Sequence, residues 1–249
     1  MPNLILDDMT WKNVRDNLSS IKLAIIPTGA TEQHGPFLPM NVDAMLVSTI
    51  SKRVGEILYP QALVSTTVPF GISYHHLRFQ GSITVSESTL ANIVYEIAMS
   101  LRLHGIRNFV MVNGHFANTS GLMMATRMLN DNKDVRCFAI NYWDYIPESD
   151  KKLIEDNVIP GHATEFETSL MSFSNPKIVP KNLKRGYTPA FSMEEYLRWR
   201  VTNVKKLFDS TEDGITVGDP EKASEEKGRK LCEGISQEIA KLLKEEFEI

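Results

Sequence analysis

The chain has 249 residues, of which 42% are hydrophobic and 23% are charged, and its formal net charge at pH 7 is −4. This composition excludes disordered and fibrous proteins, and a chain of this length can bury a large core without disulfide bonds. Its slightly acidic balance argues against a nucleic-acid partner. No apolar run approaches the ~20 residues of a membrane span and no signal peptide is evident. We therefore expect a cytoplasmic protein with no membrane partner and one domain over residues 1–249.

Short apolar runs bounded by Gly, Pro, Asn or Asp predict β-strands, and longer segments between them have helical periodicity. In chain order the predicted strands are Leu23–Ile26, Ala62–Val68, Ile83–Val85, Phe109–Val112 and Cys137–Tyr142. The predicted helices are Ala44–Leu58, Glu87–Leu103 with Ser86 as N-cap, Ser120–Leu129, and a last helix that begins at Asp219-Pro220. This alternation predicts a mostly parallel sheet. The less periodic segment 175–219 is expected to cover a site or to make a subunit contact.

The side chains suited to catalysis follow the strands, at the edge where open α/β sheets bind ligands. Glu32 and His34 come directly after the first strand, and in an extended loop residues two apart point to the same side. Asp43 starts the next helix, where the dipole favours a carboxylate that could bridge two cations. Carboxylate and imidazole together suit Zn²⁺, Mn²⁺ or Fe²⁺. The competing interpretation is that Asp43 only caps a helix and that Glu32 is solvated.

Two further clusters stand between a strand or loop and a helix. Gly114 would let the backbone turn so that His115 points into the same cleft. His162 and Glu165 are three apart at a predicted helix start, so they share one face, and His162 is a candidate general acid/base or ligand. The structural alternatives are a hydrogen-bonded turn for His115 and simple helix-dipole complementarity for Glu165 and Glu167.

The remaining three histidines lie outside these clusters. His104 precedes the helix-stopping Gly105 and is expected to interact with the helix C-terminus. His75 and His76 precede a turn and are predicted to line a substrate pocket.

Together, three segments resemble the creatininase (creatinine amidohydrolase) family: Gly29–Pro36 with Asp43, Asn113–Asn118 and His162–Leu170. They occur in the order and spacing of that family, from about residue 10 to residue 180. The resemblance implies a three-layer creatininase-like α/β fold, with a mostly parallel central sheet flanked by helices, and a homohexamer with two divalent metal ions (Zn, Mn or Fe) per chain. It also implies that Glu32 and His115 hold one ion, that His34 holds the other, that Asp43 bridges both, and that His162 donates and accepts the proton in ring opening.

One departure from creatininase affects the second metal site. Creatininase has a metal-binding Glu two residues after the His of its Asn-Gly-His motif, and this chain has Ala117 there. We predict that Glu165 supplies the missing carboxylate from the opposite loop, and that Gln33 and Glu167 orient the ligands.

A second departure affects the substrate. Trp143 matches one of two aromatic residues that pack against creatinine in the family, and we expect it to contact the substrate together with His76. The other aromatic position corresponds to Val158, so creatinine is one option among several small amides.

The resemblance thus implies a metal-dependent amidohydrolase that uses a metal-activated hydroxide to open a small cyclic amide or to cleave a related C–N bond, such as that of a formamide. The partner expected is a small-molecule substrate. Two alternatives stay open: the same site could hydrolyse a C–C bond of a cyclic diketone, or the chain could be a non-catalytic metal-binding protein, whose fold would then depend on the metal.

Overall fold

A single parallel sheet forms the centre of the molecule. The computed structural model describes residues 4–156, 161–183, 214 and 219–249, and its strand order is β1-β3-β2-β4-β5. The strands are β1 (Leu4–Ile5), β2 (Leu23–Thr28), β3 (Ala62–Val64), β4 (Asn108–Asn113) and β5 (Arg136–Asn141), and all neighbours pair in parallel. The predicted parallel sheet is confirmed.

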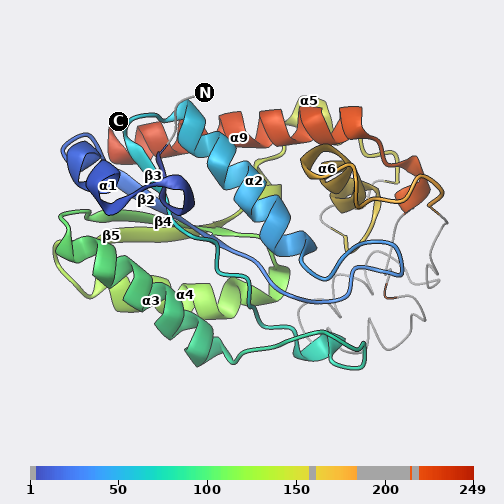
Figure 1. The fold of residues 1–249 in the computed structure, drawn as a ribbon, viewed down its shortest axis with the longest axis horizontal. Helices are drawn as coiled ribbons and strands as arrows, with labels where there is room; N and C mark the ends of the chain where they lie inside the picture. The colour runs from blue at the N-terminus through green and yellow to red at the C-terminus, as the bar shows by residue number, and fades with distance from the viewer. Residues whose placement is uncertain (1–3, 157–160, 184–213, 215–218) are drawn as a thin grey trace.

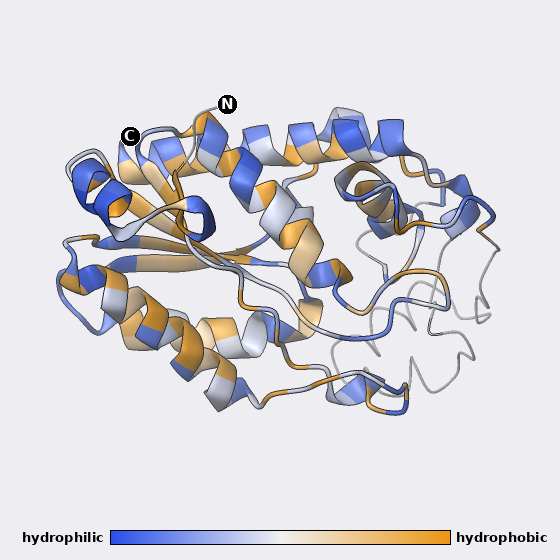
Figure 2. Ribbon diagram, in the orientation of Figure 1, coloured by the Kyte–Doolittle hydropathy of each residue, from blue (hydrophilic) through white to orange (hydrophobic). Residues whose placement is uncertain are grey.

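Helices cover both faces of this sheet, as Figure 1 shows. One face packs against α2 (Val42–Ile57), α6 (Glu165–Ser174) and α9 (Glu225–Phe247), and the other packs against α3 (Glu87–Leu103) and α4 (Thr119–Asn130). Short helices α1 (Trp11–Asn17) and α5 (Glu148–Lys151) complete the described α-helices, and single 3₁₀ turns include η2 (Tyr74–His76), η4 (Tyr142–Tyr145) and η5 (Pro220–Lys222). In Figure 2 the strands lie at the hydrophobic end of the scale between helices of mixed hydropathy. The predicted three-layer α/β fold is therefore confirmed.

Four elements differ from the sequence predictions, and the first is β3, which ends at Val64 rather than at Val68. No strand covers Ile83–Val85; Ile83 and Thr84 form only isolated bridges. Strand β1 was not predicted because it has only two residues. Asp219 caps the 3₁₀ turn η5, and α9 begins at Glu225 with Ser224 as its N-cap, because the chain is extended again at Ala223. The segment 175–219 and Val158 lie largely outside the described residues.

The site is positioned by the ends of β2 and β4, which are neighbours at the centre of the sheet. The chain leaves β2 for β3 on one side and returns to β4 on the other, so β2 lies at a topological switch point, where ligands bind beyond the strand ends. Glycines let the start of α2 approach both ends: a Cβ on Gly29 would lie 2.5 Å from the Ala44 nitrogen, and one on Gly114 would lie 2.8 Å from the Asp43 carbonyl oxygen. Gly114 is thus required for close packing rather than for a turn.

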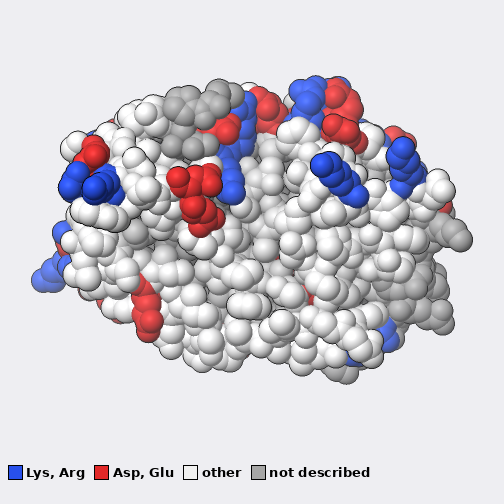
Figure 3. Space-filling view, viewed as in Figure 1, with Lys and Arg blue, Asp and Glu red and all other residues white. Residues whose placement is uncertain are grey.

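On the face shown in Figure 3, positively and negatively charged side chains are interspersed toward the upper edge, and the centre is mostly uncharged. None of the described helices combines the length and apolar character needed to cross a membrane.

Candidate metal centre

Five histidines and three carboxylates converge beyond the carboxyl ends of the strands. All are buried, and they form four overlapping groups whose ligand atoms lie within 4.8 Å of one another. Glu32 and His34 come from the loop after β2, Asp43 from the first turn of α2, and His115 from the end of β4, as predicted. The groups also include His75 and His76 from η2, and His162 and Glu167 around the start of α6.

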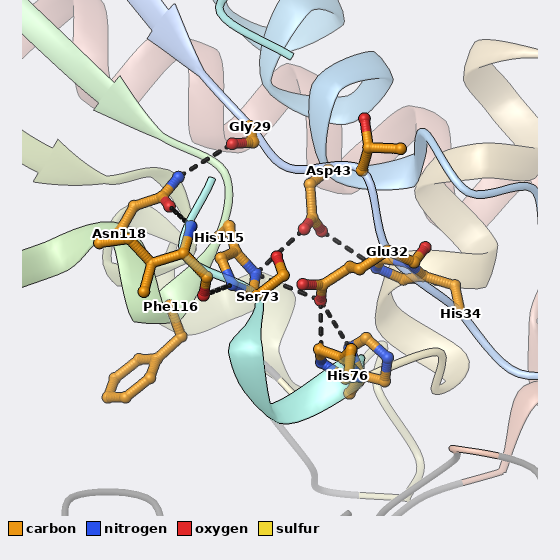
Figure 4. Close-up of polar contacts among 12 residues, drawn as sticks. Gly29, Glu32, His34, Asp43, Ser73, His76, His115, Phe116 and Asn118 are labelled. Atoms are coloured by element: carbon orange, nitrogen blue, oxygen red, sulfur yellow. Dashed lines mark hydrogen bonds and ion pairs between the residues drawn. The ribbon is translucent and has the colours of Figure 1, made fainter. Parts of the chain in front are cut away.

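The His115 ring is fixed by the backbone of the η2 loop. Its Nε2 lies 3.1 Å from the Ile72 carbonyl oxygen, so this nitrogen carries the proton and donates it. The other nitrogen, Nδ1, therefore presents a lone pair, and it lies 3.1 Å from Asp43 Oδ2 and 3.3 Å from Glu32 Oε1. Figure 4 shows His115 and Asp43 facing each other.

His34 repeats this arrangement on the other side of Asp43. Its Nδ1 lies 3.2 Å from the Glu32 carbonyl oxygen and donates to it. Its Nε2 then faces Asp43 Oδ1 at 3.0 Å and Glu167 Oε2 at 3.8 Å. A ring nitrogen fixed by a backbone carbonyl, with the other nitrogen facing carboxylates, is the usual arrangement of metal-binding histidines.

These contacts bring acceptor against acceptor, so they require positive charge between them. Burial lowers the pKa of His34, but the carboxylates of Asp43, Glu167 and Glu32 together outweigh burial and raise that pKa to about 10. Burial also lowers the pKa of His115, but Glu32 and Asp43 together outweigh burial and raise that pKa to about 9. Buried Glu32 Oε2 accepts no hydrogen bond within the part of the chain that the structure describes. The positive charge between these acceptors could therefore come from two protons or from two cations, one on each side of Asp43.

Gln33 links His162 and His76 to this cluster. Its Oε1 accepts the Gly35 N–H at 2.9 Å, which orients its amide nitrogen to donate to His76 Nδ1 at 2.9 Å; His162 Nε2 lies 2.9 Å from the same amide nitrogen. His76 accepts at Nδ1, so its Nε2 carries the proton toward Glu32 Oε1, 3.1 Å away. His76, predicted to contact substrate, is thus placed to orient the Glu32 carboxylate.

His162 lies beside the predicted ligands, as expected for a proton carrier. Its Nε2 is 2.8 Å from the Gln33 carbonyl oxygen, and its Nδ1 faces Glu32 Oε1 at 3.8 Å. Burial, together with His34 and His76, keeps the pKa of His162 well below its ordinary value. The ring is therefore neutral at neutral pH, with one of its two nitrogens unprotonated.

The two acidic side chains of α6 point in different directions, and Glu165, predicted to be a metal ligand, is the one directed away from the histidines. Its carboxylate pairs with Lys227 of α9 and accepts the Asp156 N–H at 3.0 Å. Glu167, predicted only to orient ligands, is the carboxylate that faces His34. It also accepts the Ala163 N–H at 2.6 Å. Among the described residues, Glu167 rather than Glu165 is therefore the carboxylate of α6 that lies within reach of the histidines.

Trp143, predicted to contact substrate, lies in η4 after β5. It is buried, packs edge-on against Tyr142 and belongs to the core cluster between the sheet and α9. Packing in the core therefore accounts for the position of Trp143.

The sequence reasoning missed how the η2 loop is fixed to the site. Asn118 accepts the Ile72 N–H at 2.9 Å and donates to the Gly29 carbonyl at 2.9 Å, so it ties the loops after β2, β3 and β4 together. In the sequence, only the adjacent pair His75-His76 indicated that this loop reaches the site. No helical or strand periodicity showed where its two side chains would point.

Comparison with known proteins identifies relatives over the whole chain. The profile of the Creatininase family, described as creatinine amidohydrolase, matches residues 7–243. The creatinine amidohydrolase of Pseudomonas putida is 29% identical and aligns over 98% of both chains. The mycofactocin precursor peptide peptidase of Mycolicibacterium smegmatis is 27% identical over 86% of this chain and 81% of its own. The 3-dehydro-scyllo-inosose hydrolase of Thermotoga maritima is 31% identical over 43% of this chain and 34% of its own.

Solved structures agree with these relatives. A creatininase described as the Mn form and a mutant creatininase of Zn-Zn type each cover 100% of both chains, with 27% identity and a TM-score of 0.78.

Proposed function

The chain belongs to the creatininase family and is a hydrolase, and from that premise we propose that it is a metal-dependent amidohydrolase that opens a small cyclic amide or cleaves a related C–N bond. The observation that carries this proposal is the arrangement of two imidazoles, His34 and His115. Each donates its ring N–H to a backbone carbonyl oxygen and turns its other nitrogen, with the lone pair, toward one of the two oxygens of Asp43.

The contacts support two sets of ligands for divalent ions. Glu32, Asp43 and His115 would hold one ion, and His34, Asp43 and Glu167 would hold the other, with Asp43 shared. Nitrogen and carboxylate donors suit Zn²⁺, Mn²⁺ or Fe²⁺. Such ions, when bound, polarise a carbonyl group and lower the pKa of water toward neutrality.

The chain's own contribution to the reaction is proton transfer at His162. The ring is neutral, donates its Nε2 proton to the Gln33 carbonyl oxygen, and presents its Nδ1 lone pair to the same side as Glu32. Nδ1 would accept a proton as water attacks the carbonyl carbon and deliver it to the departing nitrogen. Gln33 and His76 keep the ring and the Glu32 carboxylate in place.

The proposal is tested by counting metals and then assaying a substrate panel. Elemental analysis of protein purified without chelator should find two transition-metal ions per chain. A panel of cyclic amides, formamides, a short peptide and a cyclic ketone should then show turnover that releases a new amine and stops with chelator. Turnover that survives complete metal removal would refute the proposal, and so would cleavage without a new amine.

His162→Asn gives the sharper test of the proton carrier. We expect kcat to fall by about 10²–10⁴-fold, the usual contribution of a general acid/base, with both ions retained. His104→Asn, the same change at an exposed histidine at the end of α3, is the matched control and should leave kcat unchanged.

A peptide C–N bond is the second candidate bond. It is favoured by the similarity to a mycofactocin precursor peptide peptidase, which extends over 86% of this chain. Within the panel, turnover of the peptide without turnover of any cyclic amide would select it.

A further inference from the structure

One histidine of the cluster, His75, has no role in the proton transfer or in the two ligand sets above. We infer that His75 is an additional ligand of the ion held by Glu32 and His115, so that two imidazoles bind this ion. The inference rests on the proposed metal centre and specifies its coordination.

The backbone that carries His75 is fixed relative to His115. A Cβ on Gly71 would lie 2.5 Å from Asn118 Oδ1 and 2.8 Å from the Gly29 carbonyl oxygen, so the loop passes in contact with the end of β2. The next residue, Ile72, donates its N–H to Asn118 and accepts the ring proton of His115. The turn η2 starts two residues later, and its placement beside His115 is therefore determined by the same contacts that orient the His115 ring.

The side chain of His75 is already close to the proposed ion. It is 4% exposed, and one of its ring nitrogens lies within 4.8 Å of a Glu32 carboxylate oxygen and of a His115 ring nitrogen. The rings of His75 and His115 are parallel to within 7°, with centroids 5.7 Å apart. Two donors at ~2.1 Å from one ion lie at most about 4.2 Å apart, so a small rotation of the side chain completes the coordination.

His75 and its neighbour have different contacts, and this separates their roles. His76 accepts the Gln33 amide at Nδ1 and directs its Nε2 proton to Glu32, so it is a donor to a ligand rather than a ligand. His75 has no such contact with Gln33 among the hydrogen bonds described, and it lies against Glu32 and the parallel ring of His115, the position of a ligand.

The additional nitrogen makes the two ions unequal. The first ion would have two imidazoles, His75 and His115, with the carboxylates of Glu32 and Asp43, a set that suits tetrahedral Zn²⁺. The second would have one imidazole, His34, with two carboxylates, Asp43 and Glu167. Mn²⁺ prefers oxygen donors, so we expect Zn²⁺ to be favoured over Mn²⁺ more strongly at the first position than at the second.

The test measures the Zn²⁺ and Mn²⁺ affinities of both positions by competition with a chromophoric chelator. Metal-free wild type, His75→Asn and the matched control His104→Asn are compared. His75→Asn should weaken Zn²⁺ at one position by more than the ~10–100-fold that loss of an outer-shell group costs, and should weaken Mn²⁺ less. His104→Asn should match wild type. Equal affinities in His75→Asn and wild type would overturn the inference.

A second measurement can refute the inference on the wild-type protein alone. In the Co²⁺-loaded wild type, each ligating imidazole contributes one paramagnetically shifted ring N–H proton, and we expect three, from His34, His75 and His115. Two such signals in wild type would refute the role of His75, as would three that persist in His75→Asn. A wild type that binds no divalent ion would instead refute the proposed function itself.

Discussion

Replacing Lys227 with Met should destabilise the fold by about 2–4 kcal/mol without removing a metal ion. Lys227 pairs with the fully buried Glu165, and its own side chain is only 18% exposed. Breaking a buried ion pair by removing one partner costs about 3–5 kcal/mol, because the other charge is left uncompensated. The Asp156 N–H still binds Glu165, and the part of Lys227 that reaches solvent lowers the loss, so we expect the lower part of that range.

Urea denaturation of metal-free and metal-saturated protein measures this cost as a change in the free energy of unfolding. In thermal unfolding of the same proteins, the midpoint should fall by roughly 2–4 °C for each kcal/mol lost, as expected for a chain of this size. The double variant Lys227→Met with Glu165→Gln should regain part of the stability, because it no longer buries an unpaired charge. A single variant as stable as wild type would show that the pair contributes nothing to stability.

The same reasoning separates Glu165 from Glu167, which lie two residues apart on α6. Glu165→Gln should lower stability and keep two ions, whereas Glu167→Gln should weaken the ion at His34 and leave the metal-free fold at least as stable. The second expectation follows because burial, with Asp43 and Glu32 acting in the same direction, raises the pKa of Glu167 to about 7 despite the opposing His34 charge. Loss of an ion in Glu165→Gln with both ions retained in Glu167→Gln would refute this assignment and restore Glu165 as the ligand.

Three further outcomes are expected. Binding of two ions at pH 7.5 should release about two protons, because the pKa values of His34 and His115 lie at about 10 and about 9 in the metal-free protein; calorimetry in buffers of different ionisation enthalpy measures this number, and zero release contradicts it. Gly114→Ala should cost about 1–3 kcal/mol as an overpacked position and weaken both ions, since its Cβ would press on the backbone of α2; unchanged denaturation midpoints and metal affinities would contradict the close-packing role. Trp143→Phe should lower the free energy of unfolding and leave KM unchanged, because the ring packs in the core; a change in KM alone would support the predicted substrate contact.

The elements that could be predicted from the sequence are those whose local pattern and tertiary position agree. Strand β2 is apolar up to its last residue, Thr28, and is buried at all six positions. Helix α3 has an apolar stripe with Ser86 as its cap, which accepts from the Thr89 N–H. By contrast, Ile83–Val85 has a strand composition but meets only single-residue bridges. The start of α9 was misplaced because Asp219 and Ser224 are both good caps, and only the packing of α9 selects the second.

The site could be predicted where strand ends define direction. Glu32, His34, Asp43 and His115 follow β2 and β4, and parallel strands bring their carboxyl ends to one edge. On α6 no such rule operates: two residues that are two apart lie on different sides of a helix, so the spacing shows that only one carboxylate can face the histidines. Lys227, 62 residues beyond Glu165 along the chain, pairs with the Glu165 carboxylate. Glu167 is therefore the carboxylate that faces the histidines.

Whether the metal centre is catalytic or only structural can be decided by how the metal-free protein responds to pH. In a purely structural site, metal removal unfolds the protein at any pH. Here the protons on His34 and His115 can replace the cations, because both pKa values are raised above the ordinary value of about 6.5. The stability that these protons provide is complete below about pH 6.5 and is lost as pH rises through about 9 and then about 10. Metal-free protein should therefore stay folded at neutral pH and lose stability between pH 6.5 and 10, while the metal-loaded protein does not, and urea titrations across that range will show it. Unfolding on chelation at pH 7 would identify the ions as structural.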